Sequence, residues 1–112
     1  MIDPAVLASL CRGNIDLQRE AFVEFEQVNS ADAQLLFEAL DARDQSKITR
    51  LAHRIKGASR ALGAEALAQT CHLIEVAALE GDWEGVTRER ESLHREVARL
   101  SAYIASGDWQ ES

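Results

Sequence analysis

His53 and its neighbours are the residues of this sequence best suited to chemistry. Lys56 follows three residues later and Gly57 four residues later. Arg60 stands seven positions after His53, and Arg50 stands three positions before it. Residues three, four and seven apart share one face of an α-helix, so these side chains would lie on a common surface. A neutral imidazole is a nucleophile, and lysine and arginine attract phosphate oxygens. The spacing therefore indicates a place where a phosphoryl group could rest.

The apolar residues around His53 predict that its ring points away from the protein core. They recur at helical spacing, as Ile48, Leu51, Ala52, Ile55, Ser59 and Leu62. On a wheel of 100° per residue, His53 falls roughly 140° from Ile48, nearly opposite this stripe. A glycine inside an exposed helix costs roughly 1 kcal/mol relative to alanine, and folding gives no reason for Gly57. An ordinary solvated histidine would explain the exposure but not the glycine. We expect Gly57 to let another protein approach the backbone beside His53.

The other histidines and the cysteines are weaker candidates. His72 has Glu75 three residues on, and that carboxylate would repel a phosphoryl group. His94 stands beside an apolar stripe and is expected to pack at its edge. Cys71 and His72 would point about 100° apart on a helix, so no metal site is predicted. Cys11 and Cys71 match no metal spacing and are expected to be reduced, small apolar residues of a cytoplasmic protein.

Four long amphipathic helices are predicted to position this site. The first covers about residues 15–42, with a bend near Asn29 or, as the lesser alternative, a split there. Its expected apolar stripe is Leu17, Ala21, Phe25, Val28, Leu35, Leu36 and Ala39. Asp44 or Ser46 would cap the next helix and Asp82 the last one. Glycines would end the last three helices, at Gly63, Gly81 and Gly107.

The short links between these helices favour an all-α, antiparallel up-down four-helix bundle. A short additional N-terminal helix is expected from Asp3-Pro4 to about Cys11, covering one end of the bundle. We expect residues 1–112 to form a single domain, with the core bundle at about 15–105.

Charge and composition exclude several function classes. The net charge of −7 argues against nucleic acid binding, because backbone phosphates would be repelled. No run approaches the roughly 18 apolar residues of a membrane span, so no membrane contact by this domain is expected. Residues 43–60 nevertheless carry six basic residues against one aspartate, a local charge of +5. This segment would suit docking of an acidic partner.

The segment around His53 resembles the H-x-x-K-G signature of histidine-containing phosphotransfer domains. It reads His53-Arg54-Ile55-Lys56-Gly57-Ala58 and continues to Leu62-Gly63-Ala64. The similarity is strongest over residues 44–82 and includes Leu67, Glu75 and the junction at Glu80-Gly81-Asp82.

The resemblance implies a phosphorelay intermediate of two-component signal transduction. His53 would accept a phosphoryl group through Nε2 from a receiver-domain aspartate and pass it to another receiver. Lys56 would stabilise charge on the phosphoryl oxygens, and Gly57 would give the partner clearance. The partner would dock against Arg50, Arg54, Arg60 and Glu75. The Mg²⁺ of the reaction would belong to the receiver, so no cofactor is expected here.

Two other functions fit the sequence less well. A helical interaction module could bind a response regulator without carrying phosphate, but it would not need an imidazole beside a bare glycine. The phosphoacceptor region of a dimeric histidine kinase predicts an acidic residue after the histidine, where this chain has Arg54. Nothing in the sequence could bind ATP, so an autonomous kinase is not expected. We expect a monomeric cytoplasmic domain. It is similar to the C-terminal module of a hybrid sensor kinase, and such a module would be tethered to a membrane-bound sensor.

Overall fold

The chain folds into long helices joined by very short links. This computed structural model describes Arg12 and residues 14–107. It contains four helices: α2 (Ile15–Ala42), α3 (Gln45–Leu62), α4 (Glu65–Glu80) and α5 (Trp83–Ser106). The predicted N-terminal helix and the acidic tail fall outside the described residues. The all-α class and the four-helix bundle are confirmed.

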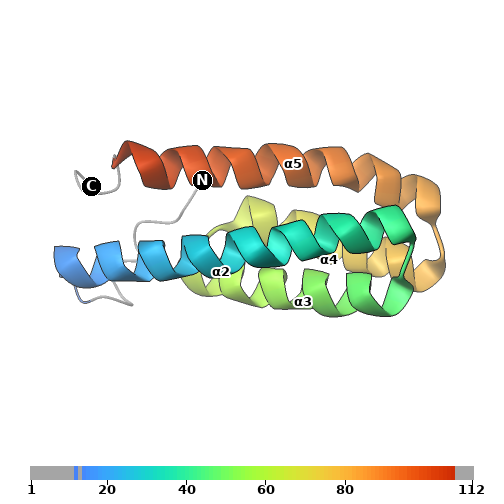
Figure 1. The fold of residues 1–112 in the computed structure, drawn as a ribbon, viewed down its shortest axis with the longest axis horizontal. Helices are drawn as coiled ribbons and strands as arrows, with labels where there is room; N and C mark the ends of the chain where they lie inside the picture. Colours follow the sequence, from blue (N-terminus) through green and yellow to red (C-terminus); the bar gives the residue numbers. More distant parts are fainter. Residues whose placement is uncertain (1–11, 13, 108–112) are drawn as a thin grey trace.

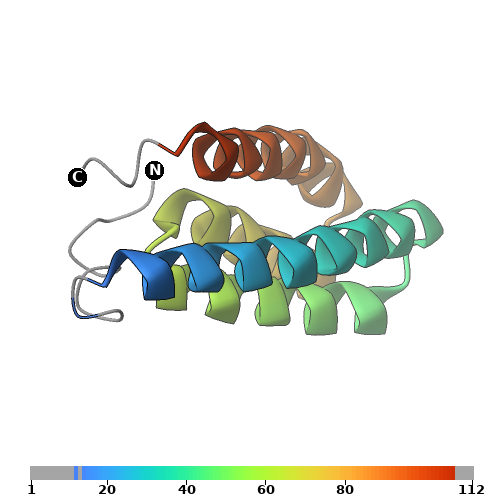
Figure 2. The same ribbon diagram turned by 60° about the vertical axis from the view of Figure 1, so that its left-hand side comes forward.

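The helices run alternately up and down along one elongated bundle (Figures 1 and 2). The molecule measures 43 × 19 × 19 Å. α3 packs between α2 and α4, while α5 packs mainly on α4 and more lightly on α2. α3 therefore keeps one long side free of other helices, and this side is available for a partner.

The start and end of α3 follow local rules that the sequence displays. Asp44, and not Ser46, caps the helix, since its side chain accepts the N–H of Lys47 at 3.2 Å. Gly63 ends the helix with a φ of 82°, a left-handed conformation that glycine adopts without steric cost. All six predicted core residues of α3 are buried. The helix that carries His53 is thus fixed in length and in rotation.

The buried face of α2 differs from the predicted stripe. Leu17, Val28 and Leu35 are 48 %, 52 % and 47 % exposed, whereas Phe22, which the stripe omitted, is 1 % exposed. α2 packs against both α3 and α5, and its buried face includes three polar residues: Gln18, Asn29 and Asp32. Apolar spacing alone therefore misplaced the face by about a quarter turn in its first half. The helix continues through Asn29, so the alternative split is wrong.

The core is a single cluster of apolar side chains from all four helices. Fully buried side chains come from every helix, among them Phe22, Leu36, Ile48, Ile55, Leu67, Ile74 and Leu93. Burial of each such side chain stabilises the fold by about 1.5–3 kcal/mol. The Asp82 cap of α5 is confirmed by its 3.0 Å hydrogen bond from the N–H of Gly85. No helix in the described part is long and apolar enough to span a bilayer.

Candidate functional site

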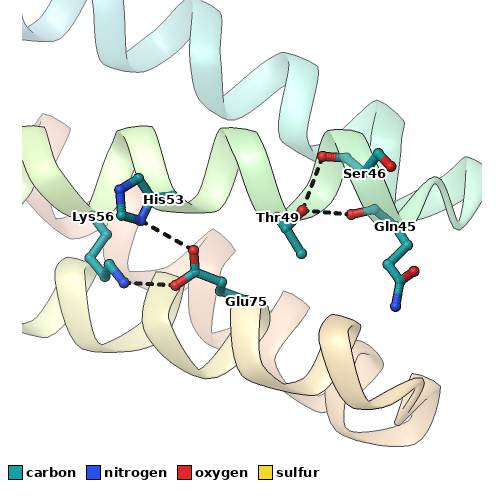
Figure 3. A network of polar contacts seen from close by, with 6 residues as sticks. All are labelled: Gln45, Ser46, Thr49, His53, Lys56 and Glu75. Atoms are coloured by element: carbon teal, nitrogen blue, oxygen red, sulfur yellow. Dashed lines mark hydrogen bonds and ion pairs between the residues drawn. The ribbon is translucent and has the colours of Figure 1, made fainter.

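His53 stands on the free side of α3. Its side chain is 72 % exposed, which confirms the prediction from the helical wheel. One turn earlier, the Thr49 hydroxyl donates to the carbonyls of Gln45 and Ser46 at 3.0 and 3.1 Å (Figure 3). Thr49 is therefore engaged with its own helix and leaves the imidazole to other partners.

Glu75, on α4, holds one edge of this imidazole. His53 Nδ1 lies 3.2 Å from Glu75 Oε2, within hydrogen-bonding distance (Figure 3). A carboxylate can only accept, so the nitrogen that faces it must carry the hydrogen. A neutral imidazole has a single N–H, and Nε2 is then left with a free lone pair. The second nitrogen lies on the side of the ring away from Glu75 (Figure 3). The geometry supplies a nucleophilic nitrogen that faces solvent.

Lys56 binds the other oxygen of the same carboxylate. Lys56 Nζ lies 2.7 Å from Glu75 Oε1, and the two side chains are only 12 % and 16 % exposed. Burial raises the pKa of Glu75, but the hydrogen bond and charge of Lys56, together with His53, outweigh it and lower that pKa. Glu75 is therefore ionised at neutral pH and remains an acceptor for His53.

The start of α3 is also tied to α4. The Gln45 side-chain amide donates to the carbonyl of Ala78, near the end of α4, at 2.6 Å. This contact satisfies a helix-terminal carbonyl and fixes the register of the two helices that carry His53 and Glu75.

Gly57 leaves open space one turn beyond His53. A Cβ built at this position would meet nothing within 4 Å. The helix continues through the glycine, and its φ lies outside the left-handed region. Neither backbone conformation nor crowding requires a glycine here, and its role toward an approaching partner stays a prediction.

The predicted docking cations do not all face the same way. Arg50 and Arg60 are exposed, and neither forms an ion pair with the described residues. Arg54 turns to α2 instead, where its Nε and Nη2 donate to the two carboxylate oxygens of Asp32 at 2.9 and 2.6 Å. Glu75 faces inward to His53 and Lys56, so the structure places it beside the imidazole and not at the exposed rim.

Asp32 is the residue of this region that sequence reasoning missed. Its side chain is 9 % exposed, and it forms an ion pair with Arg54, the residue that follows His53. This ion pair links α2 to α3. No spacing within one helix could reveal this pair, because Asp32 lies on α2 and Arg54 on α3.

The remaining histidines occupy other environments. The His94 ring stacks on Phe37 at a centroid distance of 4.0 Å, which confirms its predicted packing role. His72 is half-buried, and its Nδ1 has no hydrogen-bond partner in the part of the chain that the structure describes. Neither has the arrangement of carboxylate and cation found at His53.

Comparison with known proteins assigns the chain to a family. The Hpt domain family model matches residues 20–103. The structure is similar to histidine-containing phosphotransfer protein B from Pseudomonas aeruginosa PAO1, with a TM-score of 0.87 and 28 % identity. This similarity covers 99 % of the present chain and 96 % of the other. A search of curated proteins gave no match. Because the matched segment contains His53 and nearly all of the four helices around it, this chain belongs to the Hpt domain family and is a phosphotransfer intermediate of two-component phosphorelays.

Proposed function

We propose that His53 is the residue that carries the phosphoryl group. It would accept the group from a receiver-domain aspartate and pass it to the aspartate of another receiver. The proposal rests on the different environments of the two edges of the His53 ring. Nδ1 is held 3.2 Å from Glu75, while the side chain as a whole is 72 % exposed.

The transfer step follows from this arrangement. The Nε2 lone pair attacks phosphorus, and the P–O bond to the donor aspartate breaks, so that its electron pair returns to the carboxylate. The ring keeps its Nδ1 proton and gains positive charge as the N–P bond forms. Glu75 is placed to stabilise that charge, since it is ionised and already oriented before the reaction. The reverse sequence delivers the group to the second receiver.

Docking of the receiver is proposed over α3 and α2. A groove of about 280 Å³ lies between these helices and is walled mostly by apolar residues, among them Phe25, Val28, Ile55 and Ala58. Ala58 directly follows Gly57, so a partner seated in the groove would pass over the bare glycine to reach His53. Arg50 and Arg60 would attract the acidic pocket of a receiver, where the Mg²⁺ of the reaction is proposed to bind.

The domain is proposed to act as a carrier without kinase activity of its own. Its sequence has no glycine-rich phosphate loop, so the phosphoryl group would come from a partner's active site. A cytoplasmic location and a monomeric state stay predictions.

A transfer assay with two matched histidine variants tests the proposal. A phosphorylated receiver and Mg²⁺ are mixed with the wild-type protein, His53→Gln or His94→Gln, and the label on each is measured. Acid-labile label should appear on the wild type and on His94→Gln but be absent from His53→Gln, with circular dichroism showing all three folded. Equal labelling of His53→Gln would show that another residue carries the group. Binding without any labelling would favour an interaction module.

A further inference from the structure

We propose that the seam between α4 and α5 is a second docking surface, which binds a basic segment of a partner protein through an aliphatic side chain flanked by lysine or arginine. A groove of about 170 Å³ lies along this seam, between the second half of α4 and the first turns of α5. This surface is separate from the His53 site, so its role does not depend on the proposed transfer of a phosphoryl group.

The groove lies on the far side of α4 from the phosphoacceptor. Glu75 marks the side of α4 that faces His53. On a wheel of 100° per residue, Leu73 and Glu80 fall roughly 160° and 140° from Glu75. Both of these residues line the groove. A receiver docked over His53 would therefore leave the groove uncovered, and both surfaces could be occupied at once.

Aliphatic side chains of α4 form one wall of the groove. Leu73, Val76 and Ala77 line it and share one face of the helix. Leu73 is 40 % exposed and Val76 is half-buried, and neither belongs to the core cluster or packs against it. The opposite wall presents bare backbone at Gly85, because a Cβ there would lie 2.5 Å from Asp82 Oδ2. The groove thus offers an incoming aliphatic side chain apolar surface that folding leaves uncovered.

The rim of the groove is acidic. Among its lining residues, Glu80, Asp82 and Glu89 carry negative charge against the positive charge of Arg88. Asp82 caps α5, whereas neither Glu80 nor Glu89 has an ion pair or hydrogen bond with another described residue. Glu89 is half-buried, so its carboxylate is partly removed from water without a cation to compensate.

This charge selects the chemistry of the partner. A lysine or arginine brought from outside would pair with the carboxylates of Glu80 and Glu89, while its aliphatic neighbour enters the groove. The same carboxylates repel the phosphates of nucleic acids and of anionic lipids. The occupant that fits both the wall and the rim is a basic segment of a protein.

An NMR titration of the full ¹⁵N-labelled chain with a model peptide tests this surface. The probe is a short amphipathic helical peptide of leucine, alanine and lysine, and the control peptide has glutamate in place of every lysine. The lysine peptide should shift amide signals around Leu73 and Glu89, leave those around His53 unchanged, and bind less tightly as salt rises. The glutamate peptide should not bind.

Matched variants separate the groove from the overall charge of the protein. Glu89→Lys should raise the Kd for the lysine peptide about tenfold, whereas Glu20→Lys, the same change at an exposed position of α2, should raise it less than about twofold. Leu73→Ser should also weaken binding at least fivefold. Val23→Ser is its control, because Val23 is a 52 % exposed aliphatic residue of α2. Circular dichroism verifies that each variant is folded.

Several outcomes would overturn the inference. Shifts centred on the groove between α2 and α3, equal weakening by Glu20→Lys, or no binding of the lysine peptide would each show that this seam is not a docking surface for basic segments. Sedimentation showing self-association that Leu73→Ser abolishes would assign the face to a second copy of the chain. Saturating peptide should leave the rate of labelling by a phosphorylated receiver unchanged, and slower labelling would show that the two surfaces overlap. A chain that takes no label would contradict the proposed function alone, since the titration reports on the groove directly.

Discussion

Replacement of Gly57 by alanine should make the protein more stable. The new Cβ would meet nothing within 4 Å, so neither strain nor lost packing opposes the change. The gain is then the difference in helix propensity between glycine and alanine, about 1 kcal/mol at an interior helix position. For a domain of this size, 1 kcal/mol corresponds to a rise in Tm of about 4 °C. Thermal unfolding followed by circular dichroism measures it.

A longer side chain at the same position should separate stability from function. Gly57→Gln should also be more stable than the wild type, since glutamine is a good helix former. Its side chain would cover the surface beside His53, and we expect the Kd for a receiver to rise at least tenfold. Ala98→Gln adds the same extension at an exposed position of α5, on the far side of the bundle from α3, and should leave receiver binding unchanged.

The reasoning about Gly57 has two ways to fail. A loss of stability in Gly57→Ala would mean that the glycine serves the fold. Wild-type binding by Gly57→Gln would mean that close approach of a partner is not its purpose.

Three further predictions test the core and the site. Leu36→Ala should cost about 2–5 kcal/mol of unfolding free energy and the neighbouring Leu35→Ala less than about 1 kcal/mol, because Leu36 is fully buried and Leu35 is 47 % exposed; urea denaturation measures both, and equal losses would contradict the observed face of α2. Burial raises the pKa of the Cys71 thiol to about 12, so in a Cys11→Ser background a thiol reagent at pH 8 should modify Cys71 only as fast as the protein unfolds. Rapid modification of the folded protein would refute this. The lowered pKa of Glu75 stabilises the folded state above the ordinary value of about 4.5, and this contribution is lost as the pH falls through the lowered pKa. Glu75→Gln should therefore show a shallower loss of stability in acid than the wild type, and parallel pH curves would contradict the ion pair between Lys56 and Glu75.

The sequence by itself determined the elements and the exposed face of α3. Capping by Asp44, termination at Gly63 and the six buried positions of α3 all depend on residues within one helix. Such effects act over a few residues, so a helical wheel predicts the buried face and local spacing narrows the cap to Asp44 or Ser46. For the same reason, the exposure of His53 and the open space at Gly57 could be predicted before any contact between helices was known.

Only the tertiary structure decided which side chains meet across helices. Glu75 reaches His53 and Lys56 from a separate helix, and Asp32 reaches Arg54 in the same way. These pairs depend on the rotation and register of whole helices, which apolar spacing fixes only loosely when buried polar residues such as Asn29 share the core face. The error in the face of α2 and the correct prediction for α3 have this common origin. A helix whose buried positions are nearly all apolar, such as α3, reveals its orientation in the sequence, whereas α2, which buries three polar residues, takes its orientation from the helices it packs against.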